Sequence, residues 1–223
     1  MTAATGADEA PTPPTSWTVR TRTRISRIVP QGQALPDRQP AYMSSWIYVF
    51  GVLTIAALLV VIATGVLLAI GGVAWWHVSP AGHFVNSLHL WSVELFFAFM
   101  VIHLWGKFWM AAWRGNRALT WMTGVLAFLG SIGTAFTGYL SQSNFDSQWI
   151  STQAKDGLNA VGVGAYFNVL NPGQMLVWHV TLLPLLIGLI VAIHLVLVRR
   201  HGIVPPLEAE AADANLADEG GAR

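Results

Sequence analysis

Four histidines lie inside long apolar stretches of this sequence, where ionisable side chains are costly and therefore functional as a rule. His89 and His103 are fourteen residues apart, and His179 and His194 are fifteen apart. In a helix these spacings correspond to about 21–22 Å, with each pair within roughly 60° of one helix face. Each pair therefore places one imidazole near each surface of a membrane.

Four apolar stretches are long enough to cross about 30 Å of hydrocarbon, which takes roughly 20 helical residues. They are expected at Trp46–Ile70, Phe84–Trp113, Leu119–Leu140 and Met175–Val198. The chain is 54% hydrophobic and 10% charged, whereas soluble domains average about 25% charged residues. The predicted fold class is therefore all-α, an integral membrane four-helix bundle.

The positive residues predict how this bundle is oriented. Ten lie before the first span, at the end of the second or between it and the third, or directly after the fourth: Arg20, Arg22, Arg24, Arg27, Arg38, Lys107, Arg114, Arg117, Arg199 and Arg200. Only Lys155 falls on the opposite side. Because positive residues accumulate in cytoplasmic loops, both termini are predicted to be cytoplasmic, in a multi-pass protein of the plasma membrane. The loops 71–82 and 141–174 then face outside.

With this orientation, the second and fourth spans both run from outside to inside. His89 and His179 then share the outer level, and His103 and His194 share the inner level. Two levels with two facing imidazoles each predict two bis-histidine haem sites, stacked across the bilayer. A role for the four histidines in hydrogen bonding between helices is the alternative, and the matched pairs argue against it.

Glycines repeat at the same period on the two spans that lack histidine. Gly51 and Gly65 are fourteen residues apart in the first span, and so are Gly124 and Gly138 in the third. Glycine allows a flat group or another backbone to approach closely. Such glycines also occur at ordinary helix contacts, but their register with the histidines favours a role at the cofactor.

The regions outside the spans are assigned by composition. Residues 1–44 form a polar segment that shows no signal-peptide pattern, residues 45–203 the membrane domain, and residues 204–223 an acidic, Ala-rich tail predicted to be disordered. In the loop 141–174, Val161–Leu170 is predicted to form a short helix on the membrane surface. No cysteine is present, which excludes disulfides, iron–sulfur ligation and thioether-linked haem.

Three further ionisable residues lie in or near the spans. Glu94, in the second span, points about 140° away from His89. A neutral, hydrogen-bonded carboxyl at a protein interface is favoured for it over a proton relay. His77 and His83 are expected to be surface histidines near the first loop.

Several segments resemble the amino-terminal haem-binding half of cytochrome b from quinol–cytochrome c or plastocyanin oxidoreductases, in its split type. They are Ala63–Gly65, Ser87–Ser92, Leu119–Gly124, Thr137–Tyr139, Leu183–Leu185 after His179, and Arg199–Ile203. The likeness covers Tyr48 to Pro206, and the fifteen-residue gap in the fourth span suits the split type. It implies two non-covalent haems b, the low-potential one on His89 and His179 and the high-potential one on His103 and His194.

The resemblance also implies partners. They are a Rieske iron–sulfur protein, a c-type cytochrome, a separate cytochrome b carboxy-terminal half, and quinone or menaquinone near Arg200 and His201 at the inner face, in a homodimeric complex. Membrane lipid is a partner by composition, and no nucleic acid is expected. The chain would be an electron-transfer subunit without a complete catalytic cycle of its own.

Some positions depart from the family pattern. The Pro-Trp that normally follows the Gly-Tyr of the third span is missing after Tyr139, and the Pro-Glu-Trp-Tyr motif of the other half is absent. Asn86 replaces an arginine that usually faces a haem propionate, and Gly106 replaces another, with Lys107 beside it.

These residues and motifs lead to three hypotheses for the function, two of them redox functions and one from another class. The first, which the otherwise complete cytochrome b pattern favours and which we prefer, is a subunit of a quinol-oxidising complex that passes electrons across the membrane. The second is a dihaem membrane anchor between an outside-facing redox enzyme and the quinone pool, which the altered segment after Tyr139 favours. The third is a small transporter or assembly factor whose histidines bind metal, which would show no haem absorbance.

Overall fold

The computed structural model describes residues 17–28 and 45–206. The chain divides into two units, residues 1–38 and 39–223. The described part of the first unit is the helix α1 (Trp17–Ile28), which carries four of the arginines counted above and which the sequence analysis did not predict. The rest of the polar segment and the tail from residue 207 lie outside the described residues.

Four membrane-length helical spans confirm the predicted all-α bundle. The elements are η2 (Trp46–Tyr48) with α3 (Val49–Val78), α4 (Pro80–Trp109), η3 (Gly115–Arg117) with α5 (Ala118–Ser141), and α7 (Pro172–Val177), η4 (Trp178–Leu182) and α8 (Leu183–His201) in one continuous run. All four are long and apolar enough to cross a membrane. The first, third and fourth spans are longer than predicted, and the second begins and ends four residues earlier than predicted.

The predicted first loop, residues 71–82, is wrong. The helix α3 continues to Val78, with one break at Gly72, whose φ of 78° only glycine adopts without strain. Ser79 alone separates it from α4, where Pro80 begins the helix and the Ser79 hydroxyl accepts a hydrogen bond from the Gly82 N–H at 3.4 Å. Proline suits a first helical turn because its missing N–H has no partner there.

The helix in the long loop lies earlier than predicted. It is α6 (Phe145–Ala160), and the residues 161–170 that were expected to form a helix are turns and irregular backbone. Asn144 caps α6, since its side chain accepts the Ser147 N–H at 2.8 Å. Gly162, at φ 80°, ends the helical path. The prediction followed apolar composition and missed both signals.

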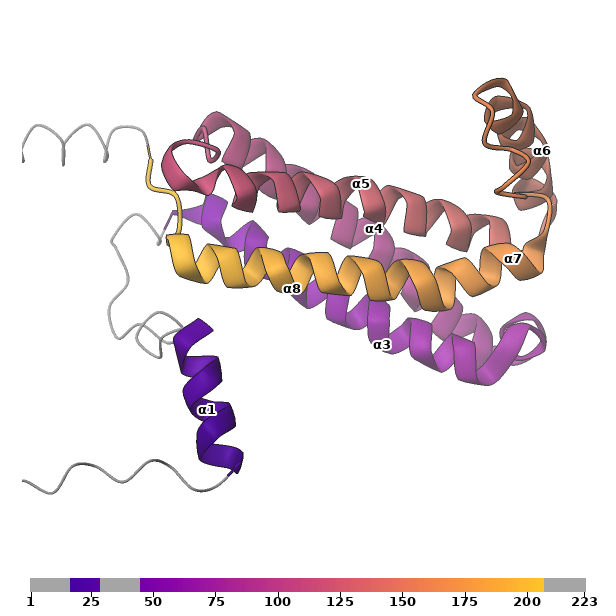
Figure 1. The fold of residues 1–223 in the computed structure, drawn as a ribbon. Helices are drawn as coiled ribbons and strands as arrows, with labels where there is room; N and C mark the ends of the chain where they lie inside the picture. The colour runs from indigo at the N-terminus through magenta and orange to yellow at the C-terminus, as the bar shows by residue number, and fades with distance from the viewer. Residues whose placement is uncertain (1–16, 29–44, 207–223) are drawn as a thin grey trace, which may run out of the picture. The chain divides into compact units, whose positions relative to one another are not determined.

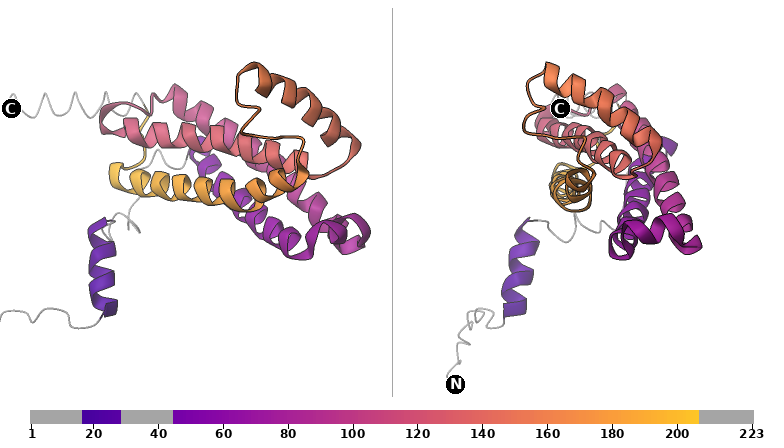
Figure 2. Two further views of the ribbon diagram at one scale, coloured as in Figure 1. Left: turned by 45° about the vertical axis from the view of Figure 1, so that its right-hand side comes forward. Right: turned by 90° about the vertical axis from the view of Figure 1, so that its right-hand side faces the viewer.

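The four spans form two packed pairs. The most extensive contacts between spans are those of α3 with α4 and of α5 with α8, and the two pairs touch each other through far fewer residues. Figures 1 and 2 show each pair side by side along one axis, with α6 running across that axis at one end. We call this end, where α3 ends and α4 begins, the loop end. The opposite end, which carries Lys107, Arg114, Arg117, Arg199 and Arg200, is the basic end.

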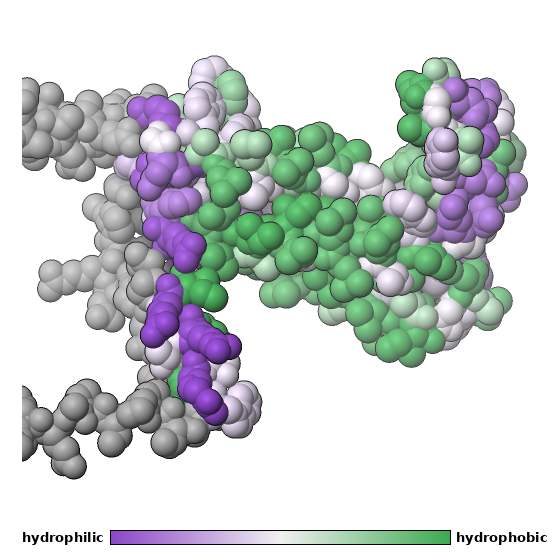
Figure 3. Space-filling view, viewed as in Figure 1, coloured by the Kyte–Doolittle hydropathy of each residue, from purple (hydrophilic) through white to green (hydrophobic). Residues whose placement is uncertain are grey.

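Apolar residues fill the middle of the bundle and cover it. Ala57 of α3 packs with Phe96 and Met100 of α4 in a buried cluster. At the loop end a second cluster, Leu140, Val169 and Met175, anchors the connection between α6 and α7 onto α5. Hydrophobic side chains also dominate the face between the two ends that Figure 3 shows, as expected for lipid contact.

Candidate functional site

At the loop end, His89 of α4 faces His179 of η4. The ring centroids are 6.2 Å apart and the ring planes are nearly perpendicular, at 89°. Two imidazoles that bind one metal ion from opposite sides, each with a nitrogen at about 2 Å, have centroids roughly 6 Å apart. The two rings come from different helix pairs. Their separation is the one that a shared metal ion requires.

A threonine orients the His89 ring. The His89 Nδ1 lies 2.9 Å from the Thr64 hydroxyl oxygen, and that hydroxyl donates to the Val60 carbonyl at 2.7 Å. Because the hydroxyl proton is already used, the oxygen accepts, and Nδ1 of His89 must carry the proton that it donates. The other nitrogen, Nε2, is then left with a free lone pair, which is the form that binds a metal.

His179 is positioned by an irregular turn of helix. Its Nδ1 donates to the Thr134 carbonyl of α5 at 2.8 Å, which also leaves Nε2 free. The residue lies in η4, a π-helical turn in which the Leu183 N–H reaches back five residues to the Trp178 carbonyl. Pro184 follows in the first turn of α8 and has no N–H to continue the α-helical pattern.

The π-helical turn changes the meaning of the fifteen-residue spacing. A π-bulge adds one residue to a helix without adding a normal step of rotation. The fifteen residues from His179 to His194 therefore correspond to about fourteen α-helical steps, the spacing from His89 to His103. Both histidine pairs then lie at matching offsets on their helices. Sequence analysis missed this turn, and Pro184 was the available signal.

Towards the basic end, His103 of α4 and His194 of α8 each lie against a glycine of a neighbouring span, Gly51 and Gly124. The His194 Nδ1 donates to the Thr120 carbonyl at 2.9 Å, and the Thr123 hydroxyl lies 3.1 Å away. The buried Nδ1 of His103, in contrast, has no hydrogen-bond partner among the described residues. The structure thus brings these two predicted residues to one level of the bundle, with unequal support for the two rings.

Each of the four histidine rings lies against one of the four predicted glycines. A Cβ atom placed on Gly51 would lie 3.1 Å from Cε1 of His103, one on Gly65 3.2 Å from Cε1 of His89, and one on Gly124 3.1 Å from Cε1 of His194; one on Gly138 would overlap the His179 ring. Such distances are shorter than ordinary van der Waals contact. The glycines therefore leave the room that the imidazoles occupy.

The arrangement fits haem iron. Among the described residues, no group of three or more His, Cys, Asp or Glu side chains could hold a metal ion, so each level offers two imidazoles only. Haem needs no more, because the porphyrin supplies the in-plane nitrogens and the protein supplies the axial ligands. The free Nε2 atoms of His89, His179 and His194 and the glycines beside all four rings meet that requirement.

The remaining predicted residues lie away from the four imidazoles. Glu94 is exposed on α4. His77 and His83 are exposed, as predicted, and His83 Nε2 lies 2.8 Å from the His77 carbonyl. His201 lies near the end of α8, where its Nδ1 is 2.9 Å from the Thr120 hydroxyl.

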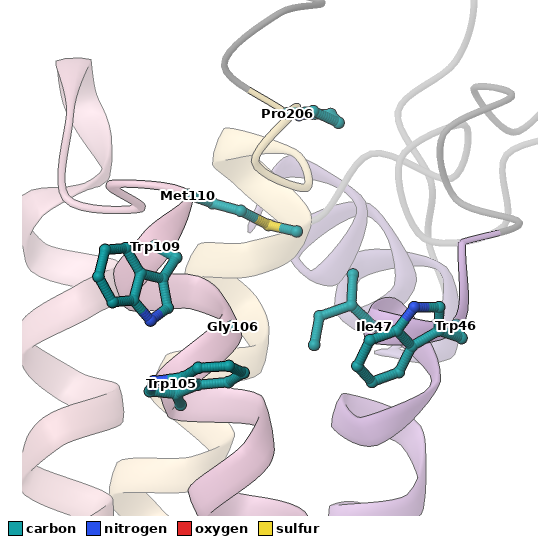
Figure 4. A pocket seen from close by; sticks show the side chains of 7 residues that line it. All are labelled: Trp46, Ile47, Trp105, Gly106, Trp109, Met110 and Pro206. Carbon is teal, nitrogen blue, oxygen red and sulfur yellow. The ribbon is translucent and has the colours of Figure 1, made fainter.

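A pocket opens at the basic end, where η2 meets the last turns of α4. It has a volume of about 440 Å³ and is lined by Trp46, Ile47, Trp105, Gly106, Trp109, Met110 and Pro206 (Figure 4). Lys107 lies beside it, with its ammonium 3.9 Å from the centre of the Tyr48 ring. Arg200 and His201, the residues predicted to border a quinone, are not among its lining residues. Sequence analysis missed this group; three tryptophans near a membrane interface were the available signal.

Asn86, which stands where the family has an arginine, lies at the loop end. Its side-chain amide exchanges two hydrogen bonds of 3.4 Å with that of Gln142, just after α5. The residues after Tyr139 thus connect α5 to α4 at the position where the family pattern has Pro-Trp.

Comparison with known proteins agrees with this architecture. The chain is 33% identical over 139 residues to a cytochrome bc complex cytochrome b subunit of Chlorobaculum thiosulfatiphilum, covering 57% of this chain and 32% of that protein. It is 29% identical over 195 residues to a cytochrome b6 of Heliobacterium mobile, covering 75% and 89%. It is 26% identical over 219 residues to the menaquinol:cytochrome c reductase cytochrome b subunit of Bacillus subtilis (strain 168), covering 81% and 94%.

A solved structure shares the fold. The chain superposes on a chain of a hyperthermophilic respiratory Complex III with a TM-score of 0.66 and 24% identity, over 83% of this chain and 55% of that one. The family profile described as cytochrome b (N-terminal)/b6/petB matches residues 94–218, more than half of the sequence. The protein is therefore a multi-pass membrane protein, and it belongs to the cytochrome b (N-terminal)/b6 family.

Proposed function

We propose that this chain binds two haems b and transfers electrons across the membrane as a subunit of a quinol:cytochrome c type oxidoreductase. Family membership supports haem b and electron transfer in a redox complex. The observation that carries the finer proposal is the facing pair His89 and His179, with 6.2 Å between ring centroids and both Nε2 atoms free. We assign His103 and His194 as the second pair because each lies one matching period further along its helix, against Gly51 and Gly124 respectively.

Each residue has a defined task in this proposal. When bound, haem supplies reversible one-electron oxidation and reduction of its iron. The four imidazoles provide axial ligands, and Thr64, Thr134 and Thr120 hold three of them in the required tautomer and direction. Phe96 and Met100 keep the region between the two levels apolar, and the four glycines leave space beside the rings.

The topology proposed from the charges makes the basic end cytoplasmic. Both termini then lie in the cytoplasm, with residues 1–44, 45–203 and 204–223 as polar segment, membrane domain and tail. The loop end, with α6, faces outside. The Bacillus subtilis relative is named as a menaquinol:cytochrome c reductase subunit, which supports menaquinol and a cytochrome c as redox partners. From the family resemblance we also propose a Rieske protein and a separate cytochrome b half as partners, in a homodimeric complex.

Quinone would bind at the basic end, close to the inner haem. The aromatic pocket adjoins the turn after His103, because Gly106 and Trp105 line it. Its apolar walls suit a quinone ring or its prenyl tail. We therefore place the quinone in this pocket rather than beside Arg200 and His201.

The test is haem quantitation with a reduced-minus-oxidised spectrum on the purified chain and its co-purifying partners. The wild-type chain should hold two non-covalent haems b. His89→Leu and His179→Leu should each remove the same haem and leave the other. His83→Leu changes an exposed histidine and should retain both. Two haems in His89→Leu, or loss of different haems in the two loop-end variants, would refute the pairing.

A second candidate is a dihaem anchor for an outside-facing redox enzyme of another type. The observation that favours it is local: Gln142 bonds to Asn86 where the family pattern has Pro-Trp near the outer quinol site. Co-purification decides between the two. A Rieske protein and a Pro-Glu-Trp-Tyr chain support the first candidate, and a different outside-facing redox subunit supports the second.

A further inference from the structure

Glu94 is an unusual residue for a membrane bundle. It is the one acidic residue in the four spans that the structure describes, and it lies at the middle of α4 (Pro80–Trp109). Its side chain is exposed and makes no hydrogen bond or ion pair with any residue that the structure describes. The carboxyl group therefore points away from its own bundle, half-way between the two ends of the helix.

A carboxyl group in this place calls for a partner. Ionisable residues in membrane spans almost always face protein or water and pair with other polar groups, because lipid offers them no hydrogen bonds. The chain by itself leaves Glu94 facing lipid. Another protein surface must cover it in the assembled state, or the site would oppose insertion of α4.

The residues around Glu94 form a regular seam. Positions spaced alternately by three and four residues along this face are all exposed: Trp91, Glu94, Ala98, Val101, Trp105 and Phe108. Alternate spacing of three and four is the repeat by which one helix packs along another at a small angle. A small residue beside a polar one, as in Ala98 next to Glu94, is typical of helix–helix contacts in membranes. We call these six residues the α4 seam.

We infer that the α4 seam binds a transmembrane helix of a different subunit, and that this helix presents a Lys, Arg or His side chain to Glu94. Charge placement argues against a second copy of the chain. The Lys and Arg residues within the described spans are Lys107, Arg117, Arg199 and Arg200, all at the basic end. A copy with the same membrane orientation brings none of them to the depth of Glu94. The histidines nearest that depth, His89 and His179, face each other inside the bundle.

Site-specific cross-linking in native membranes tests the partner. A photo-reactive phenylalanine analogue replaces Ala98, within the seam, or Leu126, an exposed residue of α5 (52% exposed) that serves as control. Position 98 should cross-link, above the level at position 126, to a membrane-spanning peptide from another subunit that contains Lys, Arg or His. Products that contain a second copy of the chain, or no protein product above the control, would overturn the inference.

Substitution of Glu94 tests the role of its charge. In the Ala98 cross-linking background, Glu94→Leu should lower the partner product about three- to tenfold, and Glu94→Gln should keep an intermediate amount. Because Glu94 is exposed and makes no hydrogen bond or ion pair with any described residue, the yield and melting temperature of the purified chain should not change. An undiminished product in a normally folded Glu94→Leu chain would refute the role. Exchange of charges, Glu94→Lys with the partner's basic residue changed to Glu, should restore the product.

Discussion

The two histidine levels share a spacing but differ in how their rings are held. At the loop end, both Nδ1 atoms are engaged, that of His89 by the Thr64 hydroxyl and that of His179 by the Thr134 carbonyl. At the basic end, His194 has two neighbours for its Nδ1, and His103 has none among the described residues. One level is supported on both sides, and the other on one side.

This difference shows that ligand spacing and ligand support have separate origins. A hydrogen bond to Nδ1 fixes the tautomer and ring direction and makes the imidazole a stronger base. His103 lacks that help, so contact with Gly51 and the surrounding packing must hold its ring. We therefore expect the loop-end site to depend on single hydrogen bonds and the basic-end site to depend on packing.

The largest effect is expected for Gly138→Ala. A Cβ atom at this position overlaps the His179 ring, whereas one on Gly133 of the same helix meets nothing within 4 Å. Overpacking of this kind costs about 1–3 kcal/mol and displaces a ligand, so most of the loop-end haem should be lost. Gly133→Ala is the matched control and should bind haem like the wild type. Equal haem-to-protein ratios in the two variants would contradict the contact.

Thr64→Val should have the next largest effect. It removes the hydroxyl that orients His89 and keeps the shape of the side chain, so affinity for the loop-end haem should fall about 10–100-fold. At the basic end, Thr123→Val should change affinity less than about threefold, because the Thr120 carbonyl still accepts from His194. Haem titration of the apoprotein measures both. Similar losses at the two levels would erase the proposed contrast.

A smaller effect is expected from removing the N-cap of α6. This helix lies at the loop end, and the basic end has no counterpart among the described residues. Asn144→Ala removes the acceptor for the Ser147 N–H and should destabilise α6 by about 1 kcal/mol. Hydrogen exchange of the α6 amides should become faster while haem content stays constant. Loss of haem in this variant would show that α6 supports the site directly.

The smallest effect is expected for the amide pair at the loop end. The two Asn86–Gln142 hydrogen bonds are long, at 3.4 Å, so Asn86→Ala should cost under about 1 kcal/mol. Gln142→Ala should lower the free energy of unfolding by the same amount, measured by thermal unfolding. The double variant should lower it little further, because both changes break one interaction. Fully additive losses would mean that each amide has another partner.

Local pattern was sufficient for the spans and insufficient for the turns between them. Long apolar runs force helices in lipid, because the backbone must satisfy its own hydrogen bonds there. The segments at 71–82 and 161–170 were misassigned, because Gly72 joins two helical stretches across a kink and Gly162 ends α6. At those places, one residue's backbone conformation outweighed the composition of the segment.

The sequence by itself determined the four spans, the family and the presence of two histidine levels, since these follow from apolar length, residue identity and periodicity. Tertiary structure alone decided that Thr64 and Thr134 orient the loop-end rings. It also decided that Glu94 has no hydrogen-bond or ion-pair partner among the described residues. The physical reason is that such contacts join residues far apart in the chain, and they exist only once the helices have chosen their neighbours.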